Sequence, residues 1–253
     1  VIIVFSLMLG VLLVMTYYMI AIDFLMVLFF KEYLAFMGLN DYLALLYSLI
    51  LVIALHTLSY IDIKFSRKLR KFSYEVPIVI DIDKVVLHAE AKVRGKALTY
   101  LAINATGFIA SLIISLTLLG KYLSTALMND YDINSIILLM ISAIVFLTIL
   151  HNRLVRISHN YVGIPMVKSI TITTLIGVVI GIYYGPLAAL SITYVASFTS
   201  LLLGADLIEI KGVLRYNPEV ISIGGMGLLD ALILIPSLSS IISYATVLLM
   251  NSI

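Results

Sequence analysis

Two aspartates in strongly apolar surroundings are the residues of this chain best suited to chemistry. Asp206 lies in GADLIEI (204–210), and Asp230 lies in SIGGMGLLDALIL (222–234). A carboxylate at the centre of a membrane helix costs about 2.5–3.5 kcal/mol on insertion scales, and such residues usually face a protein interior and have a function. Because one short loop separates the two segments, we expect the two carboxylates to face each other at similar depth.

The composition determines the class of protein. Hydrophobic residues make up 62% of the 253 residues and charged residues 12%, whereas a soluble domain has about 45–50% and about 25%. We therefore predict an all-α polytopic protein of the cell membrane, with residues 1–253 as one integral domain and the lipid bilayer as its surroundings. The net charge of +2, with basic residues grouped in loops, argues against a nucleic-acid partner. The absence of Cys excludes disulfides, thiolate metal sites and cysteine nucleophiles.

Seven segments have the length and apolarity of membrane spans, since about 20 apolar residues cross the hydrocarbon core. The predicted spans are 1–30, 42–61, 98–119, 135–150, 169–185, 186–207 and 220–250. We interpret the first as a retained span and not a signal peptide, because it has no basic n-region and its apolar run is too long. Only the Gly185-Pro186 turn signal separates the fifth span from the sixth. Six spans, with one of these two segments re-entrant, fit the same residues.

The basic residues predict an orientation. All Lys and Arg residues except Lys31 and Lys121 fall on one side of the seven spans. The positive-inside rule then places the N-terminus and the loop between the two aspartates in the cytoplasm, and the C-terminus outside. The one sizeable polar segment, 63–97, is rich in β-branched residues that partly alternate with polar ones. This pattern predicts a small cytoplasmic β-hairpin between the second and third spans.

Three glycines precede Asp230 and weaken helix formation there. Gly224, Gly225 and Gly227 each disfavour a helix by up to about 1 kcal/mol relative to Ala. We therefore expect an extended or re-entrant stretch, with the helix starting near Met226 and Asp230 one turn inside it. Irregular backbone at membrane depth requires burial in protein or access to water. The alternative is a structural acid hydrogen-bonded to Ser, Thr or Asn.

Asp206 can also be interpreted as a residue without a catalytic role. Glu209 and Lys211 follow it, so it fits an ordinary acid at the membrane surface as well as a functional one. Gly204, two residues before it, permits the close approach of another helix.

Other polar residues in the apolar segments suggest support for the acids, and none suggests a metal or cofactor site. Asn104, expected in the middle of the third span, is predicted to hydrogen-bond between helices, which is worth about 0.6–2 kcal/mol; support of the two acids is a second possible role. We interpret Asp23 as interfacial and His56 as a core histidine with a hydrogen-bond partner. The histidines show no metal-binding spacing; they are His56, His88, His151 and His159.

Four motifs resemble a family of uncharacterised archaeal and bacterial multi-spanning membrane proteins, classed as a domain of unknown function. They are GADL (204–207), SIGGMGLLDA (222–231), AINATG (102–107) and VGIPMV (162–167). The similarity covers roughly residues 75–235. Departures from the family pattern are Met226 for Ala, Leu228-Leu229 for Thr-Phe and Ala231 for Gly. Both acids match, and the family name implies no activity.

The aspartate pair is also similar, more loosely, to the presenilin and signal-peptide-peptidase class of intramembrane aspartyl proteases. That class carries one catalytic aspartate on each of two adjacent helices, the second directly after Gly-x-Gly. Here Ala205 stands in place of Tyr before Asp206, and two extra residues separate Gly225-Met226-Gly227 from Asp230. The Pro-Ala-Leu motif of that class is absent from the sequence. The resemblance implies that Asp206 and Asp230 are catalytic.

These residues lead to three hypotheses of different classes. The first is an aspartyl hydrolase acting on a membrane peptide: two adjacent carboxylates share a proton, one activates water, and the glycine stretch admits the substrate. The second is a proton- or cation-coupled transporter, since buried acids and glycine-broken helices also mark ion sites. The third is a non-enzymatic membrane subunit that binds a partner membrane protein and uses the acids to hold its helices together.

Overall fold

The computed structural model describes residues 2–82, 85–157, 162–214 and 219–252, and the side chains within 12–66, 99–157, 163–214 and 219–252. These ranges contain seven helices long and apolar enough to span a membrane, which confirms the predicted multi-pass helical protein. The long helices are α1 (Ile2–Phe36), α2 (Asp41–Leu58), α3 (Ser111–Met128), α4 (Ile133–Leu154), α5 (Met166–Tyr184), α6 (Pro186–Leu201) and α8 (Ala231–Ser252). Shorter segments extend two of them: the π-helical η1 (Ala105–Ala110) precedes α3, and η2 (Leu202–Leu207) and α7 (Ile210–Val213) follow α6.

Local capping explains where several helices begin. The side chain of Asn40 accepts a hydrogen bond from the Leu43 N–H before α2, and that of Asp132 accepts one from the Asn134 N–H before α4. Both are favoured N-cap residues because they satisfy an N–H that has no partner within the helix. Gly185, with φ of +86°, separates α5 from α6. The turn predicted there is confirmed, and α5 and α6 are two separate helices, each long and apolar enough to span a membrane.

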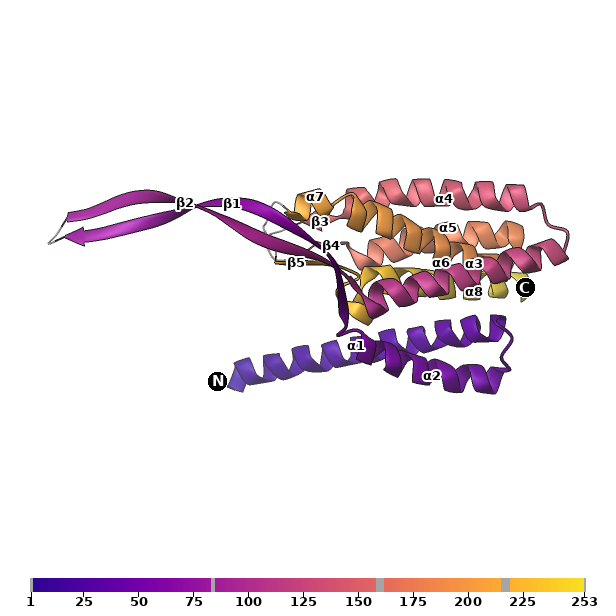
Figure 1. Ribbon diagram of the computed structural model, residues 1–253. Coiled ribbons are helices and arrows are strands. Elements are labelled where there is room, and N and C mark those ends of the chain that lie inside the picture. Colours follow the sequence, from indigo (N-terminus) through magenta and orange to yellow (C-terminus); the bar gives the residue numbers. More distant parts are fainter. Residues whose placement is uncertain (1, 83–84, 158–161, 215–218, 253) are drawn as a thin grey trace.

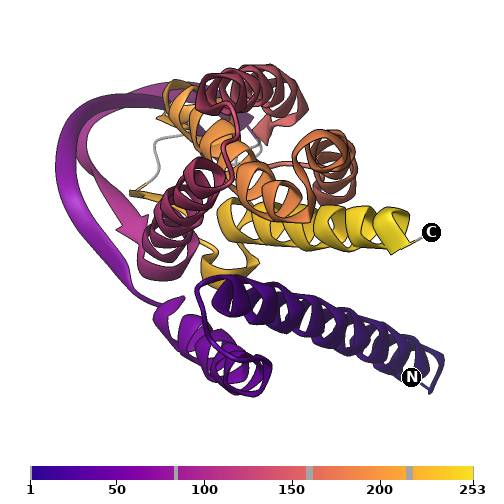
Figure 2. The ribbon, with the colours of Figure 1, turned by 90° about the vertical axis from the view of Figure 1, so that its right-hand side faces the viewer.

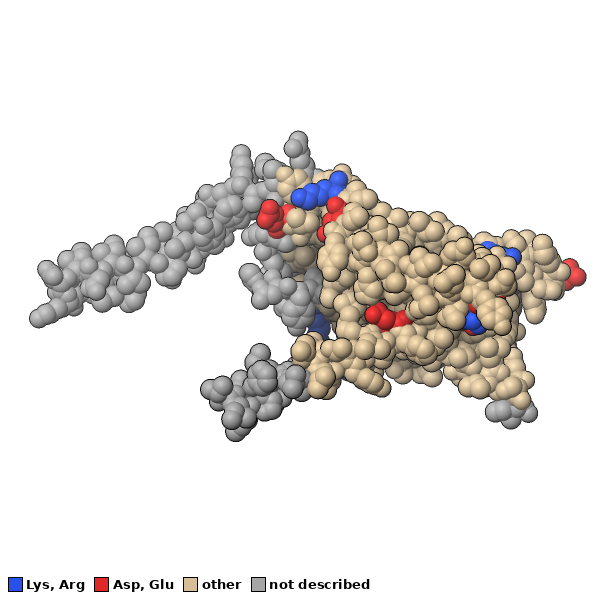
Figure 3. Space-filling model, turned by 90° about the horizontal axis from the view of Figure 1, so that it is seen from below, with Lys and Arg blue, Asp and Glu red and all other residues tan. Residues whose placement is uncertain are grey.

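The helices lie side by side, and the strands gather at one end of them (Figure 1). The hairpin of β1 (Asp62–Ile82) and β2 (Val85–Asn104) projects away from that end. The N-terminal end of α1 lies on the same side, and the C-terminus lies at the opposite end (Figure 1). Seen along the helices, α1 and α2 form a pair on one flank (Figure 2). Uncharged side chains cover most of the helical surface that faces the viewer in Figure 3.

The hairpin is longer than predicted and belongs to a three-stranded sheet. β1 and β2 pair in antiparallel register from Asp62 with Asn104 to Ile82 with Val85. A short strand missed in the sequence, β5 (Val220–Ile223), pairs in parallel with β2 from Tyr100 to Ile103. The order is β1-β2-β5. A separate two-stranded sheet joins β3 (Arg156–Ile157) to β4 (Val162–Gly163).

Two predicted span boundaries are therefore wrong. Residues 98–104 are strand and not the start of the third span, so Asn104 lies at the junction of β2 and η1 and not in the middle of a helix. Residues 220–223 are likewise strand and not the start of the seventh span. Both segments are short and apolar, and such runs fit a strand or a helix equally well by pattern alone. Hydrogen bonds to neighbouring strands satisfy the backbone N–H and C=O groups of both segments, and this pairing makes them strands and not helices.

The core centres on α6 and α8, which pack against each other. Nearly every residue of α6 from Ala188 to Leu201 is buried. Tyr194 is its largest fully buried side chain, and its ring stacks on Phe29 of α1 with centroids 5.2 Å apart. Aromatic contacts of this kind add about 0.5–1.5 kcal/mol beyond burial. They join α1 to the central helices.

Candidate aspartate site

Asp230 caps the N-terminus of α8. Its backbone is extended, with φ of −71° and ψ of 146°, and its Oδ1 accepts the Leu232 N–H at 2.9 Å. The other oxygen, Oδ2, accepts the Met226 N–H at 3.2 Å across the preceding turn. The expected helix start near Met226 is therefore wrong, because the carboxylate serves the first turn of a helix that begins after it.

The backbone hydrogen bonds and the burial of Asp230 act in opposite directions on its charge. The residue precedes the membrane-spanning segment Ala231–Ser252. Burial raises the pKa of its carboxyl group above the usual range, and the N–H donors of Leu232 and Met226 lower it in part. Burial disfavours the charged form, whereas hydrogen bonds donated to a carboxylate favour it.

The glycine segment before Asp230 forms a tight turn packed against η1. As predicted, it forms no α-helix: β5 ends at Ile223, a turn follows at 224–226, and a 3-10 helix, η4, covers Gly227–Leu229. Gly224 has φ of +72°, and the backbones of Gly224 and Gly107 touch, so that a Cβ on Gly107 would lie 2.1 Å from the Gly224 carbonyl oxygen. Only glycine fits at both positions, since no real Cβ approaches a backbone atom so closely.

The other two glycines of the segment differ from each other. Gly227 has φ of +62°, and a Cβ there would lie 2.2 Å from the Cβ of Ser59. Gly225 is exposed, and a Cβ there would lie 3.0 Å from the Cβ of Ser222. Gly227 therefore fixes the position of the turn against α2, whereas Gly225 lies on its accessible side.

Asn104 connects three segments at the base of the sheet. Its amide nitrogen donates to the Ser59 carbonyl oxygen at 2.8 Å and to Asp62 Oδ1 at 3.1 Å. Its amide oxygen accepts the N–H groups of Thr106 and Gly107 and so caps η1. Asn104 is 1% exposed. It holds Gly107 where the Gly224 turn packs against it, and it makes no direct hydrogen bond to Asp206 or Asp230.

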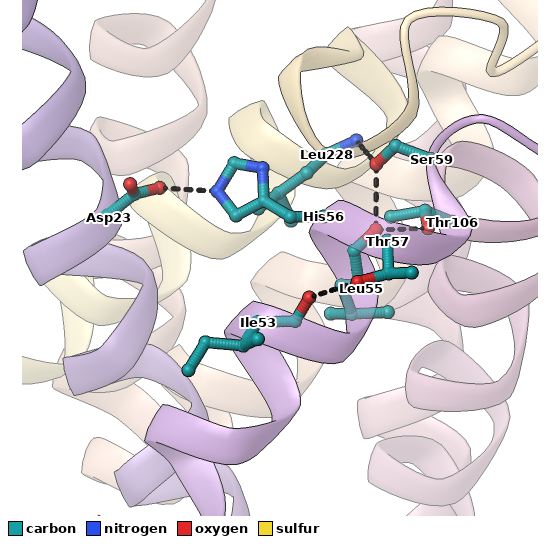
Figure 4. A network of polar contacts seen from close by, with 8 residues as sticks. All are labelled: Asp23, Ile53, Leu55, His56, Thr57, Ser59, Thr106 and Leu228. Carbon is teal, nitrogen blue, oxygen red and sulfur yellow. Dashed lines mark hydrogen bonds and ion pairs between the residues drawn. The ribbon is translucent and has the colours of Figure 1, made fainter.

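Ser59 links the end of α2 to the same turn (Figure 4). Its hydroxyl donates to the Leu55 carbonyl oxygen at 2.7 Å and accepts the Leu228 N–H at 2.8 Å. Thr106 donates to the same Leu55 carbonyl oxygen at 2.7 Å. The segment around Leu228 is irregular, so helix or strand pairing does not satisfy its backbone N–H and C=O groups. These side-chain hydrogen bonds do so instead.

Asp206 lies in η2, the π-helical extension of α6. Gly204 packs against the backbone of α4, with the Thr148 carbonyl oxygen 2.6 Å from the position of a Cβ, and Asn152 donates to the Gly204 carbonyl oxygen at 3.0 Å. This is the close helix approach that a glycine allows. Among the residues that the structure describes, Oδ2 of Asp206 is a buried oxygen without a hydrogen-bond partner.

The structure brings the two acids to the same end of the helices. η2 follows the end of α6 and Asp230 precedes α8, at the end that carries the hairpin (Figure 1). The charge of Asp230 acts on the Asp206 carboxyl group, so the two are within range of a direct electrostatic interaction. No hydrogen bond joins them in the described part of the chain. The two acids are thus neighbours, with one anchored by backbone donors and the other holding a buried oxygen without a partner.

A buried histidine cluster near this end was not predicted from the sequence. His151 of α4 is fully buried, its Nδ1 lies 3.0 Å from the Ser200 hydroxyl of α6, and its Nε2 lies 2.8 Å from the Ser169 hydroxyl of α5. Asn152, the next residue, also bonds to Glu209 Oε1 at 2.9 Å. The sequence separations of 18 and 49 residues gave no local signal for this cluster.

Asp23 and His56 form a second pair that the sequence did not reveal. His56 Nε2 lies 3.1 Å from Asp23 Oδ1, and both side chains are partly exposed (Figure 4). His56 does have a partner, as predicted, but it is not a core residue, because its side chain is 41% exposed. Asp23 of α1 is more than an interfacial acid because it joins α1 to α2. Within the described residues, no group of three or more His, Asp or Glu side chains is placed to hold a metal ion.

Comparison with known proteins identifies the family. The model of the family described as protein of unknown function (DUF1614) matches residues 45–242. This range covers most of the chain, so the protein belongs to that family. It includes both aspartates, Asn104 and the glycine turn. No curated protein and no solved structure gives a significant match.

Proposed function

We propose that this member of the DUF1614 family is an intramembrane aspartyl hydrolase that cleaves a peptide bond of a membrane-embedded substrate, with Asp206 and Asp230 as the catalytic pair. The observation that carries this proposal is the placement of two carboxyl groups, drawn from consecutive spans, at one end of the helices and within electrostatic range of each other. A neighbouring carboxylate disfavours ionisation of the second acid, so one proton shared between the two is the favoured state, as in aspartic proteases.

The surroundings of the two acids favour different roles. Asp230 accepts N–H groups from Leu232 and Met226, which favours the carboxylate form. Each carboxylate oxygen has two lone pairs, so Asp230 can still accept a proton from water as the general base. Asp206, whose buried Oδ2 has no partner, is suited to carry the shared proton.

The reaction follows from these roles. Asp230 removes a proton from a water molecule while the water oxygen attacks the carbonyl carbon of the substrate, and the Asp206 hydroxyl donates to the carbonyl oxygen. The resulting tetrahedral intermediate collapses when the C–N bond breaks and the leaving nitrogen takes the proton from Asp230. The Asp206 proton returns at the same step, so both acids regain their starting states.

The glycine turn provides the place where a substrate backbone would approach. Gly225 and Met226 are exposed on the turn that Asp230 closes through its hydrogen bond to Met226. Asn104, Gly224 and Gly227 hold this turn from the other side. We assign these three residues a positioning role, and Gly225 a role in admitting substrate.

A transition-state analogue tests the proposal without a known substrate. A photoactivatable peptide isostere that carries a hydroxyethylene group mimics the tetrahedral intermediate, and it should label the purified protein in lipid vesicles. Labelling should disappear in Asp206→Asn and in Asp230→Asn, because both acids contact the central hydroxyl group. Asp132→Asn, an exposed acid in the loop before α4, is the matched control and should label like the wild type.

Full labelling of either aspartate variant would refute the catalytic pair. If labelling fails while a proton or sodium gradient drives Asp230-dependent flux in the same vesicles, coupled transport replaces hydrolysis as the function. Gly225→Val refines the test further. It should reduce labelling and lower the melting temperature only slightly: Gly225 is exposed and needs no positive φ, but a Cβ there would lie 3.0 Å from the Ser222 Cβ and 3.1 Å from the Ser222 carbonyl oxygen.

A further inference from the structure

The two central helices carry buried hydroxyl groups without hydrogen-bond partners among the described residues. Five of them are those of Thr193, Tyr194 and Ser197 on α6, and those of Ser237 and Ser240 on α8; Ser191 of α6 and residues of α3 and α5 have such groups as well. All five residues are at most 1% exposed. More than nine in ten buried polar groups in proteins have a hydrogen-bond partner, and an unpaired one usually marks a water molecule or an ion.

These hydroxyls follow the contact between α6 and α8. Thr193 and Ser197 are four residues apart and share one side of α6, with Tyr194 beside them, while Ser237 and Ser240 are three apart on α8. The Tyr194 hydroxyl lies beside those of Ser111 on α3 and Ser237 on α8, although it forms no hydrogen bond of ordinary geometry with either. The hydroxyls thus make one polar stripe at the packed interface of the two helices.

The stripe ends at Ser243, farther along α8. The hydroxyl oxygens of Thr193 and Ser243 both lie 2.4 Å from the position of a Cβ on Gly177 of α5, so they converge on one point. Beyond it, the helices are in tight apolar contact: a Cβ on Gly181 would lie 2.5 Å from Val247 and 2.8 Å from Ala189. The stripe is therefore closed on the side away from the aspartates.

A backbone acceptor lies between the stripe and Asp230. Pro236 is inside α8 and has no N–H, so it leaves the Leu232 carbonyl oxygen without its helical donor. Ser237 follows Asp230 by seven residues, about 10 Å along a helix and on the same side of it. Asp230, the Leu232 carbonyl and Ser237 thus form a polar series that leads from the aspartate end into the stripe.

We propose that α6 and α8 enclose a column of bound water that begins at Asp230 and ends blind near Ser243. Water makes about three hydrogen bonds in such sites and satisfies polar groups that the protein leaves unpaired. The column gives Asp230 a reservoir of water and a route for proton exchange inside the bilayer. The column depends on the hydroxyl groups, the Leu232 carbonyl oxygen and the position of Asp230, and not on catalysis, so it holds whether or not the aspartates cleave peptides.

Radiolytic footprinting of the wild-type protein in vesicles tests the column directly. Hydroxyl radicals generated from ¹⁸O-labelled water modify side chains that contact bound water, even when they are buried. Tyr194 should incorporate ¹⁸O, whereas Phe30, which is equally buried in the same core, should not. Equal protection of Tyr194 and Phe30 would overturn the proposal.

Thermal unfolding is an independent test, because a hydrated interface and a dry interface predict changes in melting temperature of opposite sign. Ser197→Ala and Ser240→Ala should each lower the melting temperature by about 2–4 °C, because the bound water loses a partner. In a dry interface the same changes remove an unpaired polar group and raise the melting temperature. Ser48→Ala is the control, since Ser48 is buried but bonded to the Leu45 carbonyl oxygen of its own helix. A rise in both variants relative to this control would refute the column.

Discussion

The helices of the pair α1–α2 and of the pair α6–α8 are all apolar enough to span a membrane, yet the first pair is mostly exposed at the side of the molecule and the second is mostly buried at its centre. Within their most apolar windows, 17% and 22% of the residues of the first pair are buried, against 78% and 67% for the second. Both helices of the buried pair carry unpaired hydroxyl groups. Asp206 lies just after α6, and Asp230 lies just before α8. In a bilayer, apolar side chains suit the lipid as well as the core, so small and polar residues decide which helices become central.

The largest effect on stability should come from the contact between η1 and the glycine turn that precedes Asp230. Gly107→Ala places a methyl group 2.1 Å from the Gly224 carbonyl oxygen, where only backbone movement can relieve the clash. We expect a loss of stability at or above the upper end of the usual overpacking range of about 1–3 kcal/mol, measured as the loss of folded protein in a detergent-stability assay.

Gly120→Ala is the control for this change, because Gly120 lies on α3 with open space around it. It should leave stability unchanged or raise it slightly, since Ala favours a helix more than Gly by up to about 1 kcal/mol. Equal stability of the two variants would show that the turn does not pack on η1 as described.

An intermediate effect is expected at the end of α2, where the flanking pair meets the turn. Ser59→Ala removes the acceptor of the Leu228 N–H, and an unsatisfied buried donor costs about 1–3 kcal/mol. Chemical unfolding monitored by circular dichroism measures the change. Thr57→Ala, which removes only an exposed bond to the Ile53 carbonyl oxygen of the same helix, should have little effect. A neutral Ser59→Ala would mean that the turn does not depend on α2.

The smallest effect is expected within the flanking pair itself. A double-mutant cycle of Asp23→Asn and His56→Gln should give a coupling energy of about 0.2–1 kcal/mol, as for other partly exposed pairs. Unfolding of the four proteins at one pH measures it. A coupling energy well above this range would show that the Asp23–His56 pair is shielded from water more than its exposed fraction indicates. The pair α1–α2 would then resemble the central helices in how deeply its polar groups are buried.

Much of the architecture could be predicted from hydropathy. Seven apolar helices, the turn at Gly185-Pro186 and a hairpin within 63–97 follow from patterns within single segments of the chain, and the structure confirms them. The strand character of 98–104 and 220–223 could not be predicted, because it depends on pairing with partners distant in the chain: β1 is 29 to 42 residues from its partners in 98–104, and β5 is 120 residues from its partners in β2. The prediction that Asp230 lies one turn inside a helix failed for a related reason: the hydrogen bonds that the carboxylate makes set the helix start.

The sequence by itself determined that this protein has repeated membrane-spanning segments and that two acids lie within or beside two consecutive ones. Both facts follow from the cost of moving charge and unpaired backbone into lipid, which acts locally along the chain. Only the tertiary structure decided that the acids are electrostatic neighbours, that Asn104 and Ser59 hold the glycine turn, and that His151 lies between two serines. These contacts join distant segments, and their geometry depends on how the helices pack together.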